Sequence, residues 1–210
     1  GNRWVDNEPL FINWSADSVN DLSTASEARW QGHRFFLTAG VTWSLHANHV
    51  AIKARYQHPC VFDASSSRLT PLRDIFDPLA FLGVLNSNVF SFFLKKFIKH
   101  NQDVEINDVR AMPLVIPTNQ QMDCLKALAE RAITAKQFAF AGDAPPNELV
   151  AHVRAVAQQL TASAPPYLRP PAQQLLLATA VDCLAIIELA VNWEAEKLYD
   201  VEGLGPFDEF

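Results

Sequence analysis

The spacing of apolar positions changes along the chain from a period of two to a helical period. Residues His49–Tyr56 alternate, which is typical of a half-buried strand with one face on a core. The apolar face of this predicted strand carries Val50, Ile52 and Ala54. The opposite face carries Ala51, Lys53 and Arg55, so we expect the two cations to point outward.

Short apolar runs on either side of this segment predict further strands. They are Arg34–Thr38, Val41–Leu45 and Cys60–Asp63. Gly40 is expected to interrupt the first pair, and Ala64–Ser67 reads as a turn. Before them, a short helix is predicted near Ser23–Trp30, and the tryptophans of residues 1–30 are interpreted as packing anchors. The first part of the chain is thus predicted to be a meander of antiparallel strands.

A helix is predicted to begin at Asp77-Pro78, because aspartate is a good N-cap and proline is tolerated in the first helical turn. Apolar residues at helical spacing extend it to about Lys99. Its last turn holds Lys95, Lys96 and Lys99. These lysines suit the negative end of the helix dipole, and they equally suit contact with phosphate groups, so both interpretations stay open.

Residues 116–210 are predicted to form three or four helices. Thr118 and Gln121 match a capping box that opens a helix to about Phe140. A second helix is expected after Pro145-Pro146, and the longest covers Ala172–Tyr199. The fold class that follows is α+β, with a small antiparallel β-rich domain at 1–115 and a helical region at 116–210.

The longest predicted helix contains an apolar run, Leu175–Trp193, that is long enough to raise the question of a membrane. Asp182 and Glu188 interrupt it, and each would cost about 2.5–3.5 kcal/mol at a bilayer centre. We therefore favour a helix buried between two packing partners over a membrane span.

Composition and cysteine content narrow the class of protein. The chain has 210 residues, of which 49% are hydrophobic and 19% charged, as in ordinary soluble globular proteins. Cys60, Cys124 and Cys183 are odd in number and far apart, which favours a reducing compartment over a disulfide framework. The first residues lack the features of a signal peptide, so a cytoplasmic location is expected.

The negative net charge is confined to one half of the chain. Residues 1–115 carry 11 basic and 11 acidic side chains, whereas residues 116–210 carry 6 and 12. Between Ala28 and Arg73 there are six basic residues, four histidines and a single acid, Asp63. This asymmetry predicts that the first half meets an anionic partner and the second half does not.

The sequence contains only weak matches to motifs for metal binding, catalysis or cofactor binding. His46, His49, His58 and Cys60 have metal-ligand side chains, but their spacing matches no standard site, and hydrogen-bonding loop histidines are the favoured interpretation. Pro165-Pro166-Tyr167 is similar to part of the Asn/Asp-Pro-Pro-Tyr motif of amino-methyltransferases, but Ala164 replaces its polar residue. No Gly-rich cofactor loop is present. The segment therefore offers no catalytic motif and no cofactor site of its own.

Several short motifs follow one another in a recognisable order. They are Gly40-Val-Thr-Trp-Ser44, Arg55 with Cys60-Val-Phe-Asp63, Leu82–Ser87, and Glu105–Pro117 with its Val-Arg-Ala-Met-Pro-Leu-Val-Ile-Pro ending. Together they resemble the C-terminal target-recognition region of large adenine-specific DNA methyltransferases, of the type IIG restriction–modification and BREX phage-defence kind. The later motifs are also similar to motifs in the specificity subunits of type I systems. Trp193–Tyr199 is similar to the C-terminal end of type IIG enzymes.

The resemblance implies a division of labour. A methyltransferase domain upstream or on a partner chain would bind S-adenosylmethionine and methylate adenine N6, while this segment selects the sequence of double-stranded DNA. The helices at 116–210 would brace the module against that domain. Whether the segment contributes to an enzyme activity stays open, and no membrane is involved.

The residues expected to contact DNA are polar or basic and lie in or near the predicted strands. They are Ser44, His46, Asn48, His49, Lys53, Arg55, Arg68 and Arg73, with Lys95, Lys96 and Lys99 as candidates for backbone contact. Packing beneath the loop is favoured over base stacking for Trp43, and an ion pair with Asp63 is a rival role for Arg55. The alternative function is a protein-interaction or scaffolding module that docks a partner through its apolar C-terminal helices.

Overall fold

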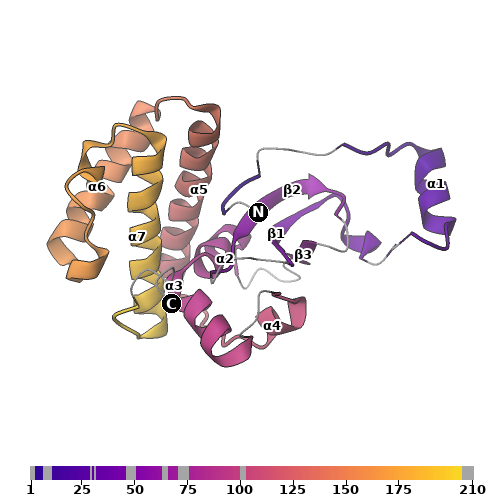
Figure 1. Cartoon of the computed structure of the whole chain (residues 1–210), viewed down its shortest axis with the longest axis horizontal. Helices are drawn as coiled ribbons and strands as arrows, with labels where there is room; N and C mark the ends of the chain where they lie inside the picture. Colours follow the sequence, from indigo (N-terminus) through magenta and orange to yellow (C-terminus); the bar gives the residue numbers. More distant parts are fainter. Residues whose placement is uncertain are drawn as a thin grey trace.

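The computed structural model describes residues 3–6, 11–28, 30, 32–45, 51–62, 66–70, 76–99 and 103–204. The described residues confirm the predicted α+β class, with one three-stranded antiparallel sheet and a larger set of helices. Figure 1 shows the sheet in the middle of the molecule, with α1 (Ala16–Thr24) at one end and α5, α6 and α7 together at the other.

The sheet has the order β2-β1-β3, so β1 (Thr38–Ser44) lies between β2 (Ala54–Cys60) and β3 (Ser66–Leu69). Several predicted boundaries were wrong. The alternating segment enters the sheet only at Ala54, and β3 includes residues that were predicted to form a turn.

Gly40 does not interrupt β1 but lies inside it. A Cβ atom at this position would stand 2.7 Å from the Leu69 carbonyl oxygen and 2.8 Å from Arg68 Nε. The missing side chain therefore lets β3 approach β1, and the glycine marks close backbone contact and not a chain break.

The segment before the sheet also differs from expectation. The described part of residues 11–30 has its helix at α1, where the Ser15 hydroxyl accepts a hydrogen bond from Ser18 N, and not near Ser23–Trp30. A 3₁₀ turn, His33–Phe35, replaces the start of the predicted strand Arg34–Thr38. Trp4 pairs in parallel with Arg55 at the edge of β2, and its indole nitrogen donates to Glu188 on α7 at 2.8 Å.

The single helix predicted from Asp77 to Lys99 is divided into α2 (Pro78–Leu85), α3 (Asn88–Phe93) and a π-helical turn (Leu94–Ile98). Its start is confirmed, because Asp77 caps α2 by accepting from Leu79 N at 2.8 Å. The break comes at Asn86 and Ser87. The Ser87 hydroxyl accepts from Phe90 N at 3.2 Å and so caps a new helix.

Asn86 explains why the helix stops there. Its side-chain amide accepts from Ala54 N at 2.9 Å and donates to Ala54 O at 3.0 Å, so it binds both backbone groups of the first residue of β2. Asn86 is 3% exposed. This contact joins α2, which packs on the sheet and on α5, to the strand that carries Arg55.

The three long helices follow the predicted pattern more closely. They are α5 (Asn119–Ala141), α6 (Asn147–Ser163) and α7 (Ala180–Tyr199), and a short helix, α4 (Ile106–Arg110), precedes them. The Thr118–Gln121 capping box is confirmed. The last helix begins later than predicted, because Thr179 and Asp182 form another capping box there.

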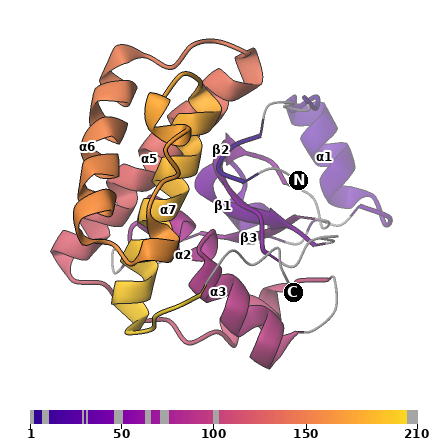
Figure 2. The same cartoon turned by 60° about the vertical axis from the view of Figure 1, so that its left-hand side comes forward.

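α7 packs against α5 and α6 (Figures 1 and 2), so the expected burial holds for one face of this helix. It does not hold for the whole run, because Leu176, before α7, is 73% exposed and Val181 is 62% exposed. No single helix among the described residues is long and apolar enough to cross a membrane. The pair α2 and Asn88–Ile98, bent by 58°, meets the length and composition criteria only when its two parts are taken together. Buried residues of the sheet, of α2 and of the long helices belong to one cluster. A domain boundary near residue 115 stays a prediction.

Tyr167 has a structural role. Its hydroxyl donates to Glu196 Oε2 at 2.6 Å and accepts from Gly203 N at 2.7 Å. Burial raises the pKa of the Glu196 carboxyl group, although the bond from Tyr167 acts in the opposite direction. The Pro165-Pro166-Tyr167 turn thus ties α7 to the segment that follows it.

Candidate nucleic-acid interface

The register of the sheet separates its residues into two faces. Val41 lies opposite Tyr56 and Leu69, and Trp43 lies opposite Ala54, which makes one face part of the core. On the other face Thr42 lies opposite Arg55 on β2 and Arg68 on β3. We call this second set the polar face; it comprises Thr42, Ser44, Arg55, Gln57 and Arg68.

The core face confirms two expectations from the sequence. Ala54 is fully buried and the adjacent Arg55 lies on the opposite side, as the alternation predicted. The alternation fails before β2, where Ala51, expected on the open face, is 2% exposed. Trp43 is also fully buried, and its indole nitrogen donates to the Val104 carbonyl at 2.9 Å. Trp43 is therefore packed beneath the sheet and is not available for stacking on a base.

Arg55 is oriented by two contacts. Its Nε lies 2.7 Å from Asp6 Oδ2, and its Nη1 donates to the Ser44 hydroxyl at 3.3 Å. The ion pair thus uses Asp6, while Asp63, the partner considered from the sequence, lies outside the described residues. The Arg55 side chain is 12% exposed. The contact with Ser44 joins the start of β2 to the end of β1, and the contact with Asp6 joins it to the N-terminal segment.

Arg68 is more deeply placed than a phosphate-binding arginine would be. Its Nη2 donates to the Thr38 carbonyl, its Nη1 donates to Gln57 Oε1 at 3.3 Å, and its guanidinium lies 4.8 Å from the Phe62 ring centroid. Desolvation lowers the pKa of this guanidinium, with Cys60 partly offsetting the effect. Arg68 therefore contributes chiefly by joining β3 to the other two strands.

Four of the expected DNA-contacting residues lie outside the described residues: His46, Asn48, His49 and Arg73. The first three fall in the sequence between Leu45, directly after β1, and Ala51, shortly before β2. The described residues on either side of these positions therefore lie close to the end of the sheet where Arg55 contacts Ser44.

The four candidate lysines have different surroundings. Lys53 is half-buried and Lys96 is exposed. Lys95 is buried, and desolvation lowers its pKa although Asp108 and Asp103 act against this. Lys99 Nζ lies 3.3 Å from Asp108 and 3.5 Å from Glu105, the residues that cap α4. Desolvation acts to lower the pKa of Lys99, but these two carboxylates outweigh it and raise the pKa.

An aromatic group next to the polar face was not singled out from the sequence. The rings of Trp14, Trp30 and His33 are stacked in that order, and we call these three the aromatic stack. Phe36 makes edge-to-face contacts with both tryptophans and with Phe62. The clustering of tryptophans in the first 30 residues was the available signal, but it predicted only packing.

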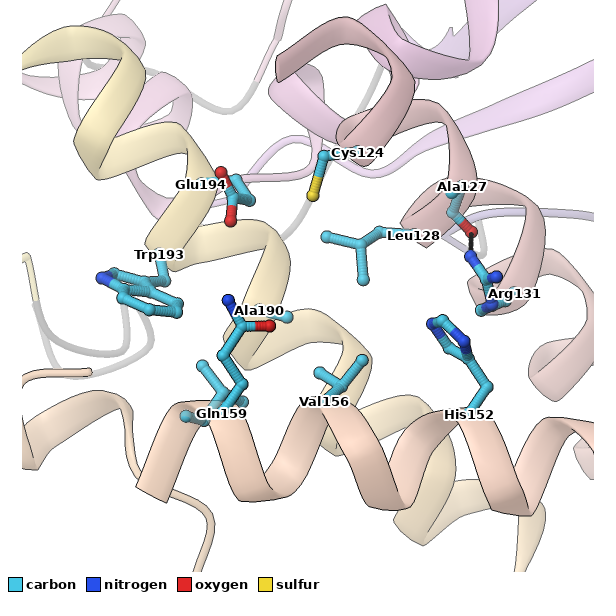
Figure 3. A pocket seen from close by; sticks show the side chains of 11 residues that line it. Cys124, Ala127, Leu128, Arg131, His152, Val156, Gln159, Ala190, Trp193 and Glu194 are labelled. Carbon is cyan, nitrogen blue, oxygen red and sulfur yellow. Dashed lines mark hydrogen bonds between the residues drawn. The ribbon is translucent and has the colours of Figure 1, made fainter. Parts of the chain in front are cut away.

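A pocket of about 210 Å³ lies among α5, α6 and α7 (Figure 3). Arg131 and His152 stand at one side of it, and Trp193 and Glu194 at the other. Arg131 donates to its own helix at Ala127 O, and no carboxylate of the described residues forms a salt bridge with it. Burial lowers the pKa of His152, and the charge of Arg131 adds to this effect.

Among the described residues no group of three or more His, Cys, Asp or Glu side chains is arranged to hold a metal ion. His46 and His49, two of the four candidate ligands, lie outside those residues. Comparison with known proteins adds no family: no protein-family model matches the sequence, and no curated protein matches it significantly.

Proposed function

We propose that this segment recognises double-stranded DNA for an adenine-N6 methyltransferase whose catalytic domain lies elsewhere in the parent protein or on a partner chain. The observation that carries the proposal is the distribution of charge: residues 28–73, which supply the three strands of the sheet, contain six basic residues and a single acid. The order of the sequence motifs also supports it.

The contacts suggest separate roles for the basic residues. Arg55 and Arg68 hold the strands in place, because their guanidinium groups are engaged within the protein. We assign phosphate contact to Lys96, which is exposed, and to Lys53, which is half-buried, and base-edge contact to the polar residues between Leu45 and Ala51. S-adenosylmethionine would bind the catalytic domain, and the protein would act in the cytoplasm, where DNA is accessible.

The proposal predicts salt-dependent binding to duplex DNA that weakens when both lysines are removed. In the Lys53→Ala/Lys96→Ala variant we expect the slope of log affinity against log salt to fall in magnitude by about 1–2, as loss of one or two phosphate contacts implies. Fluorescence anisotropy with a duplex at several salt concentrations measures this slope.

The matched control is Lys136→Ala on α5, a half-buried lysine that lies over the Phe140 ring. This variant should bind duplex DNA as the wild-type protein does. Affinity that does not depend on salt, or a double variant that is indistinguishable from the Lys136→Ala control, would contradict the proposal.

A second candidate is a protein-docking module, favoured by the pocket among α5, α6 and α7. Its walls are mainly apolar, and Arg131 offers donors to a carboxylate. A partner helix with an acidic residue would fit this chemistry. If so, Val156→Glu should abolish co-purification of the partner chain and leave DNA affinity unchanged. Co-purification that survives this substitution would exclude the pocket as the docking site.

A further inference from the structure

The geometry of the aromatic stack is regular. The ring centroids of Trp14 and Trp30 are 5.9 Å apart with an interplanar angle of 16°. Those of Trp30 and His33 are 6.0 Å apart, again at 16°. Two successive near-parallel steps give a column of flat rings. Parallel offset stacking is the arrangement that nucleobases adopt on aromatic side chains.

The column ends in an exposed ring. His33 is exposed, whereas Trp14 and Trp30 are half-buried. The His33 Nδ1 atom lies 2.9 Å from the Trp30 carbonyl oxygen, which fixes the plane of the imidazole. Gly32, with φ of +78°, supplies the left-handed turn that brings His33 back onto Trp30. Packing against Phe36 explains the two tryptophans, but it does not require an exposed ring held parallel to them.

The stack is connected to the polar face. Phe36 contacts both tryptophans and, at 5.0 Å between centroids, Phe62. Phe62 in turn lies under the Arg68 guanidinium. Arg34, next to His33 in the chain, is exposed and lies over the Phe35 ring at 4.7 Å. A flat polar ring and a cation are therefore presented side by side, within the part of the sequence that is poorest in acids.

We propose that His33 extends the Trp14–Trp30–His33 stack to an unpaired nucleobase of a nucleic-acid strand, with Arg34 near the phosphate of the same nucleotide. The inference rests on the proposed function and deepens it, because it assigns a site for a base that has left the duplex. Stacking tolerates every base, so the site would add affinity for unpaired nucleotides without adding sequence preference.

The test uses the full chain and two DNA probes, each with one 2-aminopurine. One is a single-stranded 12-mer, and the other is a fully paired duplex. Stacking quenches 2-aminopurine fluorescence. For His33→Ala we expect affinity for the single strand to fall by about 5- to 100-fold, as loss of one base–aromatic stack implies, and the quenching to be lost. Duplex affinity should stay within about twofold of the wild-type value.

Two variants control for causes other than the ring. His33→Phe keeps an aromatic ring and should retain single-strand affinity and quenching. His58→Ala removes another exposed histidine, on β2, and should behave as wild type. Because His33 is exposed, its variants are expected to fold, and far-ultraviolet circular dichroism checks this.

The outcomes separate this inference from the proposed function. Wild-type single-strand affinity and quenching in His33→Ala, with salt-dependent duplex binding intact, would overturn the stacking site alone. Absence of binding to either probe would overturn both. Binding of free adenosine monophosphate as tightly as the 12-mer would show a mononucleotide site and would contradict recognition of a strand.

Discussion

Trp43→Ala is expected to lower the free energy of unfolding by about 3–5 kcal/mol, the usual cost of removing a large aromatic side chain from a core. Trp43 is fully buried in the main hydrophobic cluster, and its indole nitrogen donates to the Val104 carbonyl oxygen. The substitution leaves both a cavity and an unpaired carbonyl oxygen. Urea denaturation followed by circular dichroism measures the change.

Two further variants separate these effects. Trp43→Phe keeps most of the buried volume and loses the hydrogen bond, so a smaller loss of about 1–3 kcal/mol is expected. Phe97→Ala removes an aromatic ring that is 68% exposed, and its stability should change by no more than about 0.5 kcal/mol. A Trp43→Ala protein as stable as Phe97→Ala would show that Trp43 is not a core residue.

Asn86→Leu should destabilise the protein by about 1–3 kcal/mol, although leucine is apolar and similar in shape. The substitution removes both hydrogen bonds to Ala54 and leaves the buried Ala54 N–H without this partner, whereas the Ala54 carbonyl still accepts from Trp4 N at 2.8 Å. Because Ala54 precedes Arg55, we also expect weaker DNA binding, which anisotropy would detect.

Asn119→Leu is the matched control, since Asn119 is exposed at the start of α5 and should tolerate the change. Equal stability of the Asn86 and Asn119 variants would show that the hydrogen bonds between Asn86 and Ala54 do not stabilise the fold. These bonds also give the end of the Leu82–Ser87 motif a physical meaning. Asn86 binds the strand, and Ser87 starts the next helix.

Local signals in the sequence determined much of the helical architecture. Asp77 and Thr118 were identified as caps because capping involves residues only two or three positions apart. The alternation around Ala54 and Arg55 likewise predicted which residue faces the core, since a strand has a strict period of two. The concentration of basic residues between Ala28 and Arg73 can likewise be counted directly in the sequence.

Contacts between distant segments decided the rest. Gly40 reads as a break in isolation, but its role depends on β3, and the single helix predicted from Asp77 is divided because Asn86 binds a strand 32 residues away. Arg68 resembles a surface cation in the sequence and is buried by Thr38, Gln57 and Phe62. The sequence by itself thus determined periodicity, caps and charge distribution, which depend on near neighbours. Only the tertiary structure decided which cations are engaged internally and which aromatic rings meet, because those partners are set by chain folding.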